Sequence, residues 1–185
     1  MTDIEEIQIV EDQLAAVIGR LAIEFGRLEL DVAELVTAAF GVADIDSRDA
    51  VDAVLSFRQK LDLVSALASS VVSTPQQLDG VRVCIRRLGE FEEQRNSLIH
   101  AFWGLERSQA ETSERNFVRS KWRSDRKKGL VRTVKPADVE GIQALTEEII
   151  KFKRLFAGES SLYSAASYLL RGANAKRKSE RQLGA

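Results

Sequence analysis

Residues 74–104 read TPQQLDGVRVCIRRLGEFEEQRNSLIHAFWG, and this stretch combines strong helix signals with the single histidine of the chain. Thr74 is followed by Pro75 and then by Gln77, which is a capping box with proline at the first helical position. Side chains with the spacing of a bundle helix follow, all apolar except one arginine. This seam comprises Val81, Cys84, Leu88, Phe91, Arg95, Leu98 and Phe102. The pattern predicts a long helix that ends at Gly104.

The same three- and four-residue spacing occurs in three other stretches of the sequence. One runs from Leu14 to Ala39, a second from Val54 to Val71, and a third from Ile142 to Phe156, in a helix that we expect Pro136 to open. Short connections join residues 14–39 to residues 54–71, and these to the helix that begins near residue 74, and short connections force neighbouring helices to be antiparallel. The sequence therefore predicts an all-α fold, an up-down four-helix bundle.

Two regions depart from this helical spacing. Residues 116–123 and 130–134 lack it and flank a polar turn, so we expect a short basic hairpin, an insertion of about residues 105–135 before the fourth long helix. A short C-terminal helix is expected over residues 161–170. Residues 1–172 would then form a single helical domain, and residues 173–185 a flexible basic tail.

Composition narrows the class of protein. The 185 residues are 44% hydrophobic and 30% charged, which is typical of a helix-rich globular chain. No apolar run approaches the ~20 residues that cross a bilayer, and the acidic N-terminus is unlike a secretory signal. Cys84 is the only cysteine, so an intrachain disulfide or a CxxC zinc site cannot form. We expect a cytoplasmic protein with no membrane contact, no metal and no cofactor.

The net charge of −1 conceals a basic segment. Between residues 115 and 135, Asp125 is the only acid among nine cations: Arg115, Arg119, Lys121, Arg123, Arg126, Lys127, Lys128, Arg132 and Lys135. Such a cluster can bind a polyanion, or it can be a solvated loop whose charges maintain solubility. Trp122 stands between Lys121 and Arg123, an arrangement that suits base stacking with phosphate contacts, although a hairpin tryptophan can also pack onto the bundle.

The stretch around the histidine is the first candidate for chemistry, because imidazole exchanges protons near neutral pH. Arg95 occupies a seam position where an apolar residue is expected, which is costly unless the guanidinium is paired or faces a wet cleft. Asn96 follows it directly, and His100 comes five residues after Arg95. At 100° per residue, Arg95 and His100 lie about 140° apart around a helix.

Arg95, Asn96 and His100 resemble, position by position, the Arg-polar-x3-His motif of the HEPN superfamily. The likeness extends to Phe25-Gly26-Arg27-Leu28-Glu29, to residues 56–62 and to residues 98–104, and covers roughly residues 14–156. That resemblance implies a homodimer in which two motif-bearing helices meet. For many members it also implies a metal-independent endoribonuclease, often in toxin–antitoxin or phage-defence systems with a cognate antitoxin or neighbouring protein.

On this reading the catalytic residues are His100 for proton transfer, Arg95 for the charge of the transition state and Asn96 for positioning. Cleavage through the 2′-hydroxyl needs a base and an acid, so one histidine per chain also points to a homodimer. Trp103, Lys121, Trp122 and Arg123 are the expected RNA-binding residues.

Two other readings stay open. The chain can be an inactive HEPN-like module that dimerises and binds a partner protein, a nucleotide or RNA, or a helical scaffold that binds nucleic acid through its basic hairpin. His100 would then cap helix carbonyls, and Arg95 would pair with a carboxylate such as Asp62 or Glu29. No phosphate loop, GxSxG, HExxH or cysteine nucleophile motif is found.

Overall fold

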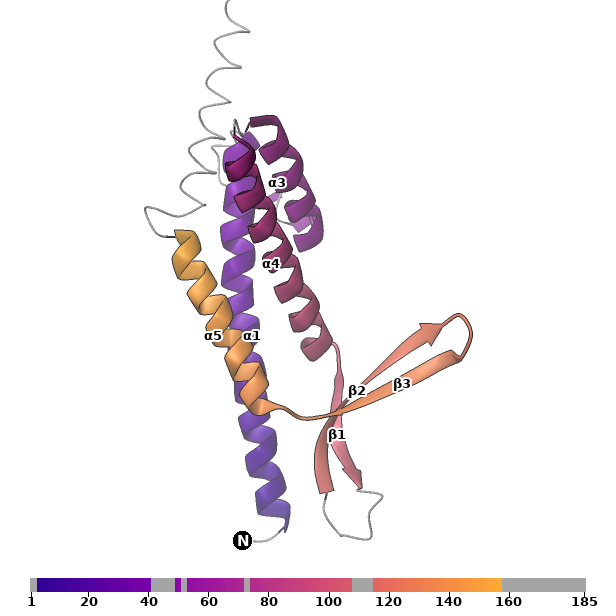
Figure 1. The fold of residues 1–185 in the computed structure, drawn as a ribbon. Helices are drawn as coiled ribbons and strands as arrows, with labels where there is room; N and C mark the ends of the chain where they lie inside the picture. The colour runs from indigo at the N-terminus through magenta and orange to yellow at the C-terminus, as the bar shows by residue number, and fades with distance from the viewer. Residues whose placement is uncertain (1–2, 41–48, 51–52, 72–73, 108–114, 158–185) are drawn as a thin grey trace, which may run out of the picture. The chain divides into compact units, whose positions relative to one another are not determined.

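The computed structural model describes residues 3–40, 49–50, 53–71, 74–107 and 115–157 (Figure 1). Its elements form two compact units, which we name the sheet unit (residues 1–24 and 93–147) and the helical unit (residues 25–92 and 148–185). In chain order the elements are α1 (Asp3–Phe40), α3 (Phe57–Val71), α4 (Pro75–Ile99), β1 (Phe102–Arg107), β2 (Arg115–Asp125), β3 (Gly129–Pro136) and α5 (Val139–Ala157).

The helical unit buries the seams that the sequence predicts. Phe25 packs against Phe57 with ring centroids 5.1 Å apart, and Phe91 meets Phe152 edge-on at 5.5 Å. The buried apolar side chains of this unit include Leu28, Val32, Leu35, Val36, Leu61, Val64, Ala68, Val81, Leu88 and Ile149. Burial of each large apolar side chain contributes roughly 1.5–3 kcal/mol, so this core holds the helices together. Val54, predicted on a seam, is exposed.

Side-chain caps fix where two helices of this unit begin. The Thr74 hydroxyl accepts a hydrogen bond from the Gln77 backbone N–H at 3.4 Å and donates to Gln77 Oε1 at 3.0 Å, so Thr74 caps α4 as predicted, with the Gln77 side chain bonded to the hydroxyl. Ser56 and Gln59 form the full reciprocal capping box at the start of α3, because the Ser56 backbone N–H donates to Gln59 Oε1 at 2.8 Å and the Ser56 hydroxyl accepts from the Gln59 N–H.

The sheet unit contains a three-stranded antiparallel sheet in the order β1-β2-β3, so the expectation of an all-α four-helix bundle is wrong. The predicted hairpin corresponds to β2 and β3, whose paired residues run from Asp125 opposite Gly129 to Val118 opposite Pro136. β1 pairs with the first half of β2, from Phe102 opposite Ser120 to Arg107 opposite Arg115. The fold is therefore mixed, with helices and a sheet.

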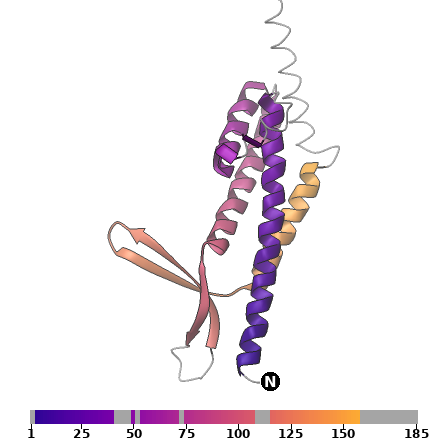
Figure 2. The ribbon, with the colours of Figure 1, turned by 180° about the vertical axis from the view of Figure 1, so that it is seen from behind.

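β1 escaped prediction because Phe102 lies four residues after Leu98 and continues the helical seam. In the structure α4 ends at Ile99, five residues before the predicted stop at Gly104. The chain then extends as β1, since the first half of β2 would otherwise leave its backbone groups without a ladder partner. In Figures 1 and 2 the end of α4 leads into β1, and the tip of the β2–β3 hairpin extends past the point where β1 begins.

Two boundaries near the sheet are set by aspartates. Asp125 Oδ1 accepts hydrogen bonds from the backbone N–H groups of Lys127 and Lys128 at 2.8 and 3.0 Å, and Gly129 closes the turn at a φ of 73°. Pro136 ends β3 rather than opening the last helix. Asp138 caps α5, because its Oδ1 accepts from the Gly141 N–H at 2.7 Å.

The apolar core of the sheet unit comes from helical segments. Leu14 and Leu21 of α1, Leu98 of α4, and Ile142 and Leu145 of α5 are buried. The predicted short helix over residues 161–170 and the tail over 173–185 lie outside the described residues.

Candidate functional site

Arg95 and Asn96 lie in the last two turns of α4 and are both half-buried. Arg95 Nη1 donates a hydrogen bond to Asn96 Oδ1 at 2.8 Å. The amide oxygen thereby fixes one edge of the guanidinium. A guanidinium carries five N–H donors in a rigid fork, so this contact orients the group without exhausting it.

His100 is exposed and lies one residue beyond the end of α4. Its backbone N–H donates to the carbonyl oxygen of Asn96 at 3.3 Å, so it completes the last helical turn. Arg95 lies about 140° around the helix axis from this position at 100° per residue. Within one chain the two side chains therefore leave the helix on different sides.

The other predicted site residues belong to the sheet, and the strand geometry separates them. Successive side chains of a strand point to opposite faces, so Lys121 and Arg123 lie on one face and Trp122 on the other. Trp122 is 57% exposed, and its cross-strand neighbour on the same face is Arg132. The cation beside Trp122 is therefore Arg132, which only the strand register identifies.

Trp103 lies in β1 on the face that carries Lys121 and Arg123, because it pairs directly with Arg119. Its Nε1–H donates to the carbonyl oxygen of Leu98 at 3.1 Å. That carbonyl is one of the last four of α4, which have no partner within the helix. Trp103 thus caps the end of α4 and holds β1 close to it.

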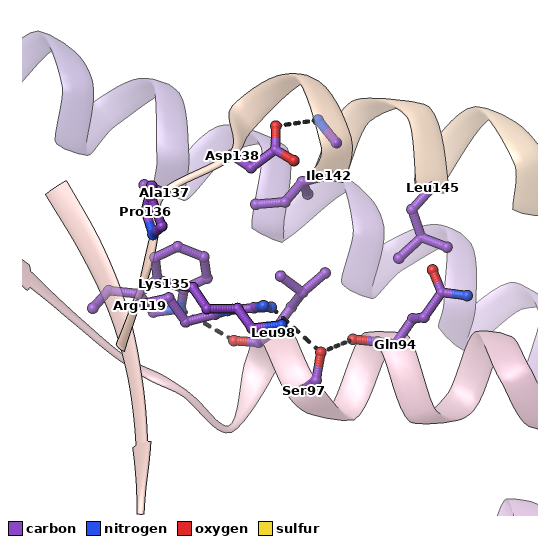
Figure 3. A pocket seen from close by; sticks show the side chains of 12 residues that line it. Gln94, Ser97, Leu98, Arg119, Lys135, Pro136, Ala137, Asp138, Ile142 and Leu145 are labelled. Carbon is purple, nitrogen blue, oxygen red and sulfur yellow. Dashed lines mark hydrogen bonds between the residues drawn. The ribbon is translucent and has the colours of Figure 1, made fainter. Parts of the chain in front are cut away.

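A second group of polar residues faces a cavity of about 770 Å³ in the sheet unit (Figure 3). Arg119 and Lys135 are direct cross-strand partners, so Trp103, Arg119 and Lys135 form one row across the sheet. Gln94, Ser97 and Leu98 of α4 line the opposite wall, and Arg119 Nη1 donates to the Ser97 hydroxyl at 3.3 Å. Sequence reasoning missed this row, because it depends on the pairing of β1 with β2.

Among the described residues, two groups have clearly shifted pKa values, and both lie in the helical unit. Burial raises the pKa of Asp31, an effect that Lys153 opposes and Glu34 reinforces. Burial also raises the pKa of the Cys84 thiol. A thiol with a raised pKa is a poor nucleophile, which argues against Cys84 as a catalytic group.

In the described part of the chain, no group of three or more His, Cys, Asp or Glu side chains is placed to hold a metal ion. None of the described helices combines the length and apolarity needed to cross a membrane.

Comparisons with known proteins add no relative to these observations. No protein-family model matches the chain, and no curated protein and no solved structure is significantly similar to it.

Proposed function

We propose that this chain is a metal-independent endoribonuclease of the HEPN type that acts as a homodimer. The observation that carries the proposal is the end of α4, where an exposed imidazole follows an arginine whose guanidinium is oriented by the next residue. The proposed setting is cytoplasmic, in a toxin–antitoxin or phage-defence system, with a cognate antitoxin or neighbouring protein as a further partner. This setting rests on the resemblance of the motif.

The chemistry needs two imidazoles. When the 2′-oxygen attacks the adjacent phosphorus, a base takes the proton of the 2′-hydroxyl and an acid protonates the departing 5′-oxygen. Each chain has one histidine, so His100 of one protomer would supply the base and its symmetry mate the acid. The exposure of His100 supports this role, because a side chain that meets a second copy must be reachable from outside the chain.

Arg95 would stabilise the charge that develops on the phosphorus-bound oxygens. A guanidinium can donate two parallel hydrogen bonds to phosphate oxygens, and such charge-assisted bonds are about twice as strong as neutral ones. The Arg95–Asn96 hydrogen bond supports a positioning role for Asn96, since it limits the guanidinium to one orientation. Asn96 therefore acts through Arg95 in this proposal.

Two features of the sheet support RNA as the substrate. Trp122 offers an exposed aromatic ring beside Arg132, which suits the stacking of an unpaired base. Trp103, Lys121 and Arg123 lie on the other face with Arg119, where the cations suit contacts to phosphates. Single-stranded RNA, whose bases are free to stack, is the substrate class that these side chains fit best.

The decisive experiment incubates the purified full chain with single-stranded and structured RNA in EDTA. His100→Ala and Arg95→Ala should each lower the cleavage rate by about 100-fold or more, because each removes a group used in the transition state. Arg82→Ala is the matched control, because Arg82 is an exposed arginine of α4 that pairs with Asp79 at 3.4 Å. Equal cleavage by the wild type and both site variants overturns the proposal.

A mixing experiment tests the shared site. Co-expressed wild-type and His100→Ala chains should show activity that falls with the square of the wild-type fraction, because only wild-type pairs contain two imidazoles. A linear decline would mean that each chain cleaves on its own, and a monomeric protein by light scattering would exclude the shared site.

One observation favours a second candidate function, an inactive HEPN-like module that binds a partner protein. Phe102, Trp122, Leu130 and Val134 are exposed and share one face of the sheet, which we name the apolar face. Exposed apolar patches often mark protein interfaces. This candidate predicts a dimer without RNA cleavage, and RNA cleavage that depends on His100 would exclude it.

A further inference from the structure

β3 is an edge strand of the three-stranded sheet, and its outer side has no strand partner among the described residues. It pairs with β2 on one side only, from Gly129 opposite Asp125 to Pro136 opposite Val118. Seven of its eight residues are exposed. In an antiparallel ladder, alternate residues direct their backbone N–H and C=O groups to opposite edges of the strand. The outer edge of β3 is therefore a row of backbone groups with which a further strand can pair.

The two faces of β3 differ in side-chain chemistry. Leu130 and Val134, which are 69% and 38% exposed, lie on one face with Arg132 between them. The aliphatic stem of an arginine is itself a surface that an apolar neighbour can cover. Lys135 lies on the other face, which Lys121 of β2 shares. A strand added beside β3 would therefore meet mainly carbon surface on one face and cations on the other.

The charge of the hairpin selects among the strands that could pair with this edge. Residues 115–136 include nine lysines and arginines, and Asp125 is their one acid. The Asp125 carboxylate already accepts the backbone N–H groups of Lys127 and Lys128 in the turn. A second copy of β3 would double the positive charge along the edge, and like charges on neighbouring strands are destabilising. The same charges attract an acidic strand, so they exclude one partner and favour the other.

We infer that the outer edge of β3 binds an extended segment of a partner protein in which acidic and apolar residues alternate. The segment adds a fourth strand, with its apolar side chains beside Leu130 and Val134 and its carboxylates beside Lys135. Alternation is required because successive side chains of a strand point to opposite faces. Hydrogen bonds between the main chains supply affinity, and the two rows of side chains supply specificity. The contact is made by the backbone edge of the sheet, so it does not rest on the proposed endoribonuclease.

The test titrates the full chain into a fluorescein-labelled peptide of sequence EVEVEVE and follows fluorescence anisotropy. This peptide should bind saturably. A form with every backbone amide methylated keeps the side chains and their charges but has no N–H to donate, so it should bind at least tenfold more weakly. The charge-reversed peptide KVKVKVK should also bind at least tenfold more weakly. Absence of saturable binding of EVEVEVE, or equal binding of its methylated form, overturns the inference.

Two measurements locate the peptide on the sheet. Hydrogen–deuterium exchange should slow at the amides of β3 when EVEVEVE binds, and should stay unchanged in β1, which forms the opposite edge. Lys135→Glu should weaken binding of EVEVEVE about tenfold. Lys151→Glu, which reverses an exposed lysine of α5, is the matched control and should leave binding within twofold. Protection of β1 in place of β3, or unchanged binding in Lys135→Glu, contradicts the site.

Other occupants of the edge give different results in the same measurements. A single-stranded RNA hexanucleotide should leave exchange in β3 unchanged, and protection of the β3 amides by this RNA would overturn the inference. Exchange in β3 that slows as the protein concentration rises, with loss of EVEVEVE binding, would mean that a second copy covers the edge and would also overturn it. His100→Ala should bind EVEVEVE as the wild type does, so peptide binding and RNA cleavage can fail independently.

Discussion

Several aromatic side chains of the helical unit are buried, whereas two on one face of the sheet are exposed. Phe25, Phe57 and Phe91 of the helical unit are each at most 4% exposed, whereas Phe102 and Trp122 of the sheet are 71% and 57% exposed. Large apolar side chains are exposed to water at a cost in free energy, and exposed apolar patches often mark interaction surfaces. These rings of the helical unit are thus held by packing, whereas the proposed roles of the sheet in binding would account for its exposed rings.

The largest expected effect is on the free energy of unfolding, and it tests the contrast between buried and exposed rings. Phe25→Ala should lower the free energy of unfolding by about 3–5 kcal/mol, because it deletes a fully buried ring and leaves a cavity. Phe102→Ala, the matched control on the sheet, should change it by less than about 0.5 kcal/mol. Urea denaturation followed by circular dichroism measures both. A similar loss in the two variants would mean that Phe102 is buried in an assembly.

A second prediction asks whether the apolar face serves RNA. In the His100→Ala background, which prevents cleavage, Trp122→Ala should weaken the binding of single-stranded RNA by about 1–3 kcal/mol through the loss of stacking. Leu130→Ala changes an exposed aliphatic residue of the same face and should have less effect. Fluorescence anisotropy with a labelled oligonucleotide gives both values. Equal losses of RNA affinity in the two variants would contradict base stacking on Trp122.

The helical part of the fold is predictable from the sequence because its signals are local. The spacing from Leu14 to Ala39 and the capping box at Thr74 each depend on residues within a few turns of one another. The β2–β3 hairpin was also predictable, since Asp125 and Gly129 supply its turn. β1 was not predictable, because no local signal shows that it pairs with residues 115–120 of β2. Phe102 also fits the helical seam of the preceding helix equally well.

The candidate site also has a part that local sequence signals predict and a part that they do not. Arg95, Asn96 and His100 are visible as a sequence motif, and their helix is present with His100 at its end. The cavity is invisible in the sequence, because Trp103, Arg119 and Lys135 come from three strands that are aligned only by register. Adjacency in sequence also misled, because Trp122 and its flanking cations point to opposite faces of the sheet.

The third prediction concerns the junction between the sheet and α5. Gly141→Ala should lower the free energy of unfolding by up to about 1 kcal/mol, because the new Cβ would collide with the Asp138 carboxylate and weaken the helix cap, worth about 0.5–2 kcal/mol, while alanine returns about 1 kcal/mol of helix propensity. Gly19→Ala is the control, since a Cβ there meets nothing and alanine favours a helix by about 1 kcal/mol. Thermal melts of the two variants should shift in opposite directions. A stabilised Gly141→Ala would show that the cap contributes little.

The smallest effect lies in the helical unit and depends on pH. Burial raises the pKa of Asp31 above its ordinary value of 3.8, although Lys153 opposes the shift. The native state therefore holds the proton more tightly than the unfolded chain, so this group makes stability fall as the pH rises through the window just above 3.8. Asp31→Asn removes the charge, and it should be slightly more stable than the wild type at neutral pH and equal to it in acid. Asp62→Asn, in an exposed pair with Arg58 at 3.7 Å, should give no such gain in urea midpoints measured across pH. A variant at residue 31 that loses stability at neutral pH would mean that attraction to Lys153 outweighs the cost of burial.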